Sequence, residues 1–257
     1  MLPCCSSLED TLTNFGTNSL VTDPRRPRST TAIRVGQLLA GTLWILFSGI
    51  AIAQPPFSEV VRSTDPLTAE EQLKTFEVPE GFKVELVSAE PDILKPLNLN
   101  FDYRGRLWVT DSTEYPFPAP EGTVARDSVK ILEDTDGDGR YDKTIVFAEG
   151  LNIPIGIYPT LNGCIVYSIP HIWLLEDTDG DDRADRKTRL YGPMGYERDT
   201  HGMNNAFTRG FDGWLYACHG FNNETRVAGR DQHEIHMQSG NTYRMRLDGN
   251  RIEQFTW

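Results

Sequence analysis

Apolar and polar residues alternate with a period of two along much of the chain from Phe76 onward, and glycine-bearing turns interrupt the alternation. This pattern is typical of half-buried β-strands. Residues 67–75 fit a short helix. Three segments repeat one motif, a turn with a glycine followed by an apolar strand: DYRGRLWVTDS (102–112), TLNGCIVYSIP (160–170) and GFDGWLYACHG (210–220). The pattern therefore predicts an all-β body.

A predicted β-hairpin follows each of these segments. The hairpins are VKILEDTDGDGRYDKTIVF, IWLLEDTDGDDRADRKTRLY and TYRMRLDGNRIEQF. Short strands and turns that recur at roughly 40–50 residues indicate β-propeller blades of four strands each. Propellers close with about 4–8 blades, so we expect a partial propeller of about three blades. It would be part of a longer protein or would close with another chain. A β-sandwich is the alternative, although a sandwich does not predict the repeated hairpin.

The first 53 residues follow a different pattern. Arginines precede an uncharged apolar run, Leu38–Ala53, that ends in Ala51-Ile52-Ala53 before Gln54. A basic region, a short apolar region and a small-residue exit are typical of a secretory signal. An uncleaved anchor is the alternative, although a spanning helix needs about 20 apolar residues. We therefore predict a signal peptide or N-terminal anchor (1–53), a linker (54–75) and the partial propeller (76–257), in an exported protein of the periplasm or cell envelope.

Charge and motifs narrow the function classes. The formal net charge of −12 argues against a nucleic-acid partner, which needs a basic footprint. The chain has no P-loop, G-x-G-x-x-G or G-x-S-x-G motif, so nucleotide, dinucleotide and serine-hydrolase functions lose support. It has no C-x-x-C-H, so we expect no c-type haem within it. Cys164 and Cys218 fall in apolar strands and are predicted to be buried thiols, although an exported protein permits a disulfide.

Two hairpins carry nearly the same acidic turn. The first has the form D-x-D-x-D-G-x-x-D, and alternating carboxylates of this kind converge when the chain curls around a calcium ion. Neither turn has the glutamate at position twelve of an EF-hand. In the second turn Asp182 replaces the glycine, and solvated turns are the alternative for both. The predicted ligands are Asp134, Asp136, Asp138, the Arg140 carbonyl and Asp142 in the first turn, and Asp177, Asp179, Asp181 and Asp185 in the second.

The stretch Arg198–Thr225 holds the best candidates for chemistry. His201 precedes a strand on a loop that enters a blade, and such loops gather where propellers bind ligands. A histidine there is suited to act as a general base, although a turn-stabilising histidine is the alternative. Glu114 and Tyr115 are weaker candidates for the same face, and the insert 221–238 is expected to cover the opening. The predicted sugar-binding residues are Asn204, Asn205, His219 and Asn222, with Asn223 beside them.

The chain resembles a known bacterial family in VPEGFKVELVSAEP, the paired EDTDGD hairpins and DTHGMNNAFTRGFDGWLYACHGFNN followed by SGNTYRMRLDG. This is the membrane-bound dehydrogenase family, a PVC-type haem-binding group related to the soluble quinoprotein glucose/sorbosone dehydrogenases. The resemblance covers roughly residues 76–257. It implies a six-bladed propeller of which this chain is the first half, followed by helical repeats and a cytochrome-like segment in the full-length protein. It also implies pyrroloquinoline quinone as a cofactor, with His201 as the base beside it.

Together these features predict the propeller segment of an exported quinoprotein-type sugar or alcohol dehydrogenase with calcium-stabilised hairpins. His201 would take the hydroxyl proton of a sugar or polyol, and electrons would pass to a haem outside this chain. The alternative is a non-catalytic cell-surface propeller that binds glycans or proteins.

Overall fold

The computed structural model describes residues 64–256, and in this part of the chain the structure is almost entirely β. Fourteen strands form four antiparallel sheets, which confirms the predicted all-β class. The predicted signal peptide or anchor lies outside the described residues. In the described part, no helix has the length and apolar character needed to cross a membrane.

The short helix α2 (Ala69–Leu73) falls inside the stretch 67–75, where the sequence predicts one. Thr68 caps it, because its Oγ1 accepts a hydrogen bond from the Glu71 backbone N–H at 3.2 Å, while the Glu71 side chain accepts one from the Thr68 N–H at 2.9 Å. This reciprocal capping box satisfies two amide groups that a helix start otherwise leaves unpaired.

Three of the sheets have four strands each. Sheet 1 consists of β1 (Pro96–Phe101), β2 (Leu107–Asp111), β3 (Asp127–Glu133) and β4 (Lys143–Leu151). Sheet 2 consists of β5 (Ile155–Thr160), β6 (Gly163–Ser168), β7 (His171–Glu176) and β8 (Arg186–Tyr191). Sheet 3 consists of β9 (Asn204–Arg209), β10 (Leu215–His219), β13 (Asn241–Met245) and β14 (Ile252–Thr256). In sheets 1 and 2 each strand pairs with the next along the chain, and in sheet 3 the order is β14-β13-β10-β9.

The fourth sheet is a hairpin inserted between β10 and β13. It consists of β11 (Glu224–Ala228) and β12 (Glu234–Gln238) and accounts for the polar insert 221–238. The three repeated segments supply β2, β6 and β10, and the three predicted hairpins supply β3–β4, β7–β8 and β13–β14. These strand predictions are confirmed.

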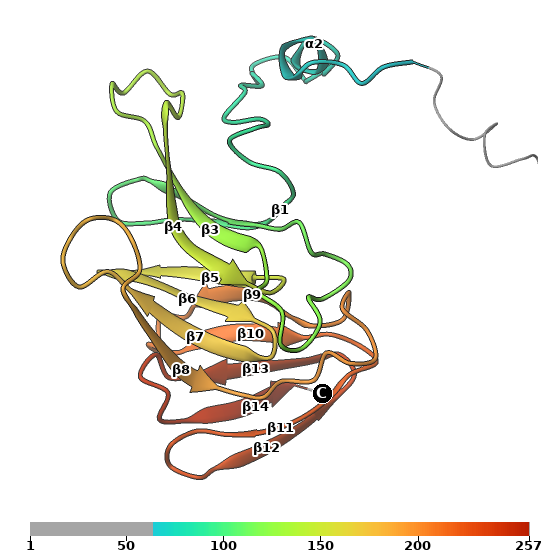
Figure 1. Cartoon of the computed structure of the whole chain (residues 1–257), viewed down its shortest axis with the longest axis vertical. Helices are drawn as coiled ribbons and strands as arrows, with labels where there is room; N and C mark the ends of the chain where they lie inside the picture. The colour runs from blue at the N-terminus through green and yellow to red at the C-terminus, as the bar shows by residue number, and fades with distance from the viewer. Residues whose placement is uncertain (1–63, 257) are drawn as a thin grey trace, which may run out of the picture. The chain divides into compact units, whose positions relative to one another are not determined.

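The first strands of the three large sheets lie next to one another. The Asn98 side chain in β1 accepts a hydrogen bond from the Gly156 N–H of β5 at 2.8 Å and donates one to the Asn205 side chain of β9, also at 2.8 Å. Figure 1 shows the three sheets fanning out from these strands. One asparagine thus ties all three sheets together.

The core lies between the sheets. Trp108, Ile131 and Phe147 of sheet 1 pack on Cys164, Val166 and Leu175 of sheet 2. A larger cluster joins sheets 2 and 3, and it includes the fully buried Tyr167, Ile172, Leu215 and Tyr243. Burying each large apolar side chain stabilises the fold by about 1.5–3 kcal/mol. These two apolar interfaces hold the sheets in place.

The connecting loops gather at two opposite ends of the sheets, because antiparallel strands that follow one another place successive loops at alternate ends. Loops 112–126 and 192–203 meet at one end, where Thr200 Oγ1 donates to the Pro116 carbonyl at 2.6 Å. We call this end the His201 edge. The acidic turns 134–142 and 177–185 belong to the other end, the acidic edge. Figure 1 shows the β7–β8 turn on the left and the loop between β2 and β3 on the right.

The two cysteines differ in exposure. Cys164 is buried in β6, and burial raises the pKa of its thiol far above the ordinary value, so it stays protonated. Cys218 is exposed, and both are free thiols. The prediction of a buried thiol is therefore confirmed for Cys164 and wrong for Cys218. Cys218 alternates with the buried Ala217 and His219 along β10, so its side chain falls on the other face of the strand.

Candidate functional site

An aspartate orients the predicted base at the His201 edge. Asp199 Oδ1 accepts a hydrogen bond from the His201 backbone N–H at 2.7 Å and lies 3.1 Å from the ring atom Nδ1. The amide of His201 is the main reason why the pKa of Asp199 is below its ordinary value, and the carboxylate therefore stays charged. The His201 side chain is 62% exposed. Because a carboxylate only accepts, Nδ1 carries the proton of the neutral ring, and among the described residues no hydrogen bond occupies Nε2.

An open pocket of ≈ 340 Å³ lies beside His201. Its other lining residues are Pro116, Phe117, Pro118, Tyr196, Glu197, Arg198, Asp199 and Thr200. The Tyr115 ring contacts the His201 ring edge-on, with centroids 5.4 Å apart. This confirms that the loop containing Tyr115 and the loop containing His201 share one face, and the volume is within the range of small-molecule sites.

Asn223 fixes the loop that carries this pair. Its Oδ1 accepts from the N–H groups of Arg198 and Asp199 at 3.2 and 3.3 Å, and its Nδ2 donates to the carbonyls of Asp199 and Gly202 at 2.6 and 3.0 Å. The side chain is 2% exposed. A Cβ on Gly202 would lie 2.2 Å from the Phe221 carbonyl oxygen, so the two loops are in backbone contact. Asn223 therefore positions the site from inside and is not free to meet a ligand.

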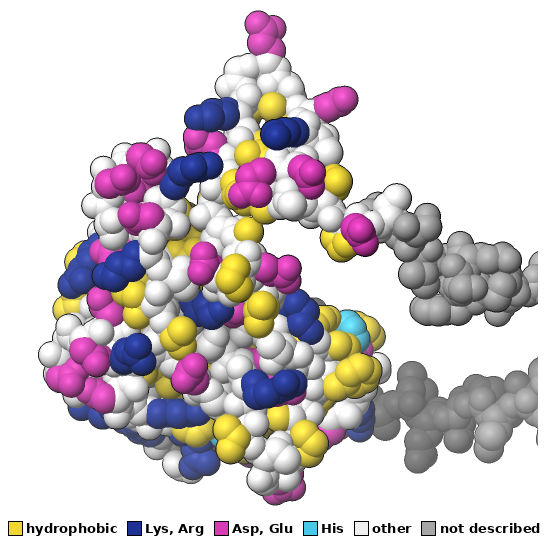
Figure 2. All heavy atoms as spheres, turned by 45° about the horizontal axis from the view of Figure 1, so that its top comes forward, with side chains coloured by type: hydrophobic (Ala, Val, Ile, Leu, Met, Phe, Trp, Pro, Cys, Tyr) yellow, Lys and Arg dark blue, Asp and Glu magenta, His cyan; other side chains and the backbone are white. Residues whose placement is uncertain are grey.

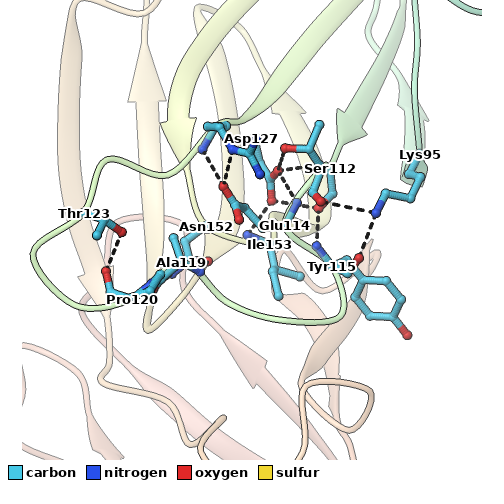
Figure 3. A network of polar contacts seen from close by, with 12 residues as sticks. Lys95, Ser112, Glu114, Tyr115, Ala119, Pro120, Thr123, Asp127, Asn152 and Ile153 are labelled. Carbon is cyan, nitrogen blue, oxygen red and sulfur yellow. Dashed lines mark hydrogen bonds and ion pairs between the residues drawn. The ribbon is translucent and has the colours of Figure 1, made fainter.

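A buried carboxylate, which the sequence reasoning missed, holds the opposite wall of the pocket. Asp127 is 1% exposed and accepts from the backbone N–H groups of Thr113, Glu114 and Ile153 at 2.6–2.9 Å. The Ser112 hydroxyl donates to it at 2.7 Å. Figure 3 shows these groups converging on Asp127, with Lys95 bonded to the Tyr115 carbonyl nearby. The loop that leads to Tyr115 is thus anchored at its base.

The other predicted ligand residues have different surroundings. Asn204 is fully buried, and its Oδ1 accepts from the Tyr243 hydroxyl at 2.9 Å. Asn205 is exposed, and its Oδ1 accepts from Asn98. Asn222 is exposed in a left-handed conformation (φ 74°). The Asn222 carbonyl accepts a hydrogen bond from Arg198 of the His201 loop at 3.5 Å.

His219 is buried, and both of its ring nitrogens bond within the protein. Nδ1 lies 3.0 Å from the Ser239 carbonyl and Nε2 2.8 Å from the Thr225 hydroxyl. Since a carbonyl only accepts, Nδ1 carries the proton and Nε2 accepts from Thr225. Thr225 Oγ1 also accepts from the Gly195 N–H at 2.8 Å. This chain of bonds ties the inserted hairpin to loop 192–203.

The two acidic turns bring carboxylates together. In the first turn, oxygens of Asp134, Asp136 and Asp138 lie within 4.8 Å of one another, and in the second those of Asp177, Asp179 and Asp185 do. The carboxylates of Asp142 and Asp185 also accept hydrogen bonds from the hydroxyl groups of Thr135 and Thr178, near the start of each turn. The charge of Asp181, followed by lost solvation, raises the pKa of Asp179 above its ordinary value. Each turn offers only oxygen atoms as ligands, and its carboxylates repel one another. Such a set of ligands fits Ca²⁺.

The departure of the second turn from the first has a structural explanation. Gly139 and its counterpart Asp182 both adopt the left-handed conformation, with φ of 91° and 62°, which aspartate tolerates better than most residues. The Asp182 carboxylate accepts from Arg106 Nη1 of sheet 1 at 2.7 Å. The exchange of glycine for aspartate keeps the turn and adds an ion pair between sheets 1 and 2.

Fold and site together define an all-β protein of consecutive four-stranded antiparallel sheets, with a histidine–aspartate pair at one edge and acidic turns at the other. Figure 2 shows acidic and basic side chains interspersed over the visible face. The chain belongs to the family described as Domain of unknown function (DUF7133), whose model matches residues 68–256. No curated protein matches the chain.

Proposed function

We propose that this chain forms part of the β-propeller of an exported sugar or alcohol dehydrogenase, in which His201 is the general base. The contact between Asp199 and His201 beside an open pocket carries this proposal. Asp199 holds the ring at Nδ1 at 3.1 Å, which directs Nε2 toward a hydroxyl in the pocket. Nε2 takes the proton of the substrate hydroxyl, and this proton transfer is the part of the oxidation that we propose for this chain.

The arrangement of the sheets supports the propeller. Sheets 1 and 2 repeat one order of strands, sheet 3 repeats it with an insert, and the first strands of all three are adjacent. Leu99 and Phe101 of sheet 1 are 61% and 56% exposed, and Phe255 of sheet 3 is 55% exposed. Further blades would cover such apolar side chains.

The residues around His201 do not by themselves fit pyrroloquinoline quinone, the acceptor that the family resemblance implies. That quinone is a tricarboxylate. The pocket offers it one guanidinium, Arg198, beside the carboxylates of Glu197 and Asp199. We therefore assign this chain the binding of the substrate hydroxyl and the removal of its proton, and we route no step through the quinone.

We also propose that the two turns of the acidic edge bind calcium. Asp134, Asp136 and Asp138 would hold one ion, and Asp177, Asp179 and Asp185 a second, because these carboxylates already converge. Bound calcium would neutralise each turn and pin its hairpin. Since the acidic edge is opposite the His201 edge, the role of the calcium ions would be structural.

A dye-reduction assay tests the enzyme. Purified full-length protein is supplied with pyrroloquinoline quinone and calcium and tested on a panel of sugars and polyols. We expect turnover that His201→Ala lowers by about 10²–10⁴-fold, as loss of a general base does. His233→Ala, in the turn of the inserted hairpin, is the matched control and should keep full activity.

Two results of this assay would refute the proposed dehydrogenase activity. One is a wild-type protein without turnover on any substrate, and the other is a His201→Ala variant as active as the wild type. Sugar binding without turnover would favour the alternative, a cell-surface propeller that binds glycans. The exposed Phe117 and the half-buried Tyr196 beside His201 suit that function as well.

A further inference from the structure

A second hollow adjoins the pocket beside His201. It has a volume of ≈ 330 Å³ and is lined by Arg198, Asn222, Asn223, Glu224, Gln238 and Ser239. Arg198 lines both hollows, so they are neighbours along the His201 edge, and we call the pair the groove. Each hollow alone is at the low end of the roughly 300–1,000 Å³ range of small-molecule sites. A ligand that occupied both hollows would be longer than one small unit.

The two halves of the groove differ in chemistry. Beside His201 the wall is apolar, with Pro116, Pro118 and Phe117, whose side chain is 79% exposed. Beyond Arg198 the exposed groups are the amides of Asn222 and Gln238 and the hydroxyl of Ser239, which both donate and accept hydrogen bonds. Saccharides present apolar C–H faces and rims of hydroxyl groups. A flat apolar wall followed by neutral donors and acceptors matches that combination.

The charge of the groove excludes an anionic ligand. Arg198 is the one guanidinium in the described lining, and three carboxylate residues, Glu197, Asp199 and Glu224, line the same hollows. Arg198 Nη2 lies 3.9 Å from Glu224 Oε2. The hydrogen bond from His236 is the main cause that lowers the pKa of Glu224, which keeps this carboxylate charged. Acidic sugars would therefore be repelled.

We propose that the groove binds a neutral oligosaccharide of two or more linked units, with one unit beside His201 and the next against Asn222, Gln238 and Ser239. This inference rests on the proposed function, which places a sugar hydroxyl at His201, and it adds that the substrate is a linked saccharide. Gln238 and Asn222 are the specificity-determining residues for the second unit.

Calorimetry on the purified chain tests this, with glucose and xylose, their linear trisaccharides maltotriose, cellotriose and xylotriose, and trigalacturonate as the acidic probe. At least one neutral trisaccharide should bind more tightly than its own monosaccharide and than trigalacturonate. Gln238→Ala should weaken trisaccharide binding by roughly 3- to 10-fold, the value of one hydrogen bond, and leave monosaccharide binding unchanged. Gln72→Ala in α2 is the matched control and should change neither.

Three results would overturn the proposal: equal affinity for monosaccharides and trisaccharides, equal affinity for trigalacturonate, or a Gln238→Ala variant that binds like the wild type. Because calorimetry does not need turnover, the two proposals fail separately. Binding that grows with chain length but without dye reduction would retain the groove and reject the dehydrogenase. Turnover that depends on His201 without a gain from chain length would do the reverse.

Discussion

At the residue scale, buried polar side chains determine the shape of the His201 edge. Asp127, His219 and Asn223 are each at most 2% exposed, and the side chain of each bonds to backbone groups of a neighbouring loop. Their hydrogen bonds offset the cost of burying polar groups. His201 and Asp199 sit on loops that these residues hold, so the geometry of the site depends on side chains that no ligand touches.

Asp127→Asn is expected to destabilise the protein. One Asp127 oxygen accepts from Thr113 and Glu114, and the other accepts from Ser112 and Ile153. An asparagine must place its NH₂ group against donors in either orientation. Urea unfolding should show a free energy of unfolding lower by about 1–3 kcal/mol.

The matched control for this variant is Asp92→Asn, at an exposed carboxylate, which should stay within about 0.5 kcal/mol of the wild type. An Asp127→Asn protein as stable as this control would show that the hydrogen bonds to Asp127 contribute little.

His171 is expected to make stability depend on pH. Burial, followed by the charges of Arg189 and Lys187, lowers its pKa below the ordinary value of 6.5, and its buried Nδ1 has no partner in the described residues. As the pH falls through 6.5, the unfolded chain therefore binds more protons at this position than the folded one. The stability contribution is complete above that pH and is lost on acidification.

Urea unfolding between about pH 7.5 and pH 5 measures this effect. His171→Phe keeps a ring against Trp173 but cannot titrate, so its free energy of unfolding should fall less than that of the wild type. Parallel pH profiles for the two proteins would contradict the assignment.

At the element scale, the third hairpin is a natural control for the two acidic ones. The β13–β14 turn has the same position in its sheet but carries only Asp248. Calcium titration by calorimetry should show two sites in the wild type, one in Asp136→Ala, one in Asp179→Ala, and both in Asp248→Ala. Each occupied site should add about 2.7 kcal/mol of stability at a free calcium concentration of about 100 times Kd. Identical heats for wild type and Asp136→Ala would remove the first site.

The individual strands and hairpins show how far the sequence predicts the fold. Strands β2, β6 and β10 and the three hairpins are predictable because glycine turns and period-two alternation are local features. The inserted hairpin is less so, because its strands lie in a polar stretch. The sequence indicates His201 through its place before a strand. It does not distinguish the buried Asn223 from the exposed Asn222, because burial depends on loop contacts such as that between Gly202 and Phe221.

At the scale of the whole described body, the two edges carry different groups. The His201 edge gathers the candidate base, the groove and the inserted hairpin. The acidic edge gathers both carboxylate turns and the Arg106–Asp182 ion pair between sheets 1 and 2. The packed sheets separate the two edges. A metal at one edge would therefore stabilise the sheets without entering the reaction at the other.

Backbone amide NMR of the labelled protein, titrated first with calcium and then with a neutral trisaccharide, tests this division most directly. Calcium should shift resonances in residues 134–142 and 177–185, and the saccharide should shift those in 115–118, 196–202 and 222–239. Saccharide shifts confined to the acidic turns, or none around His201, would contradict the account.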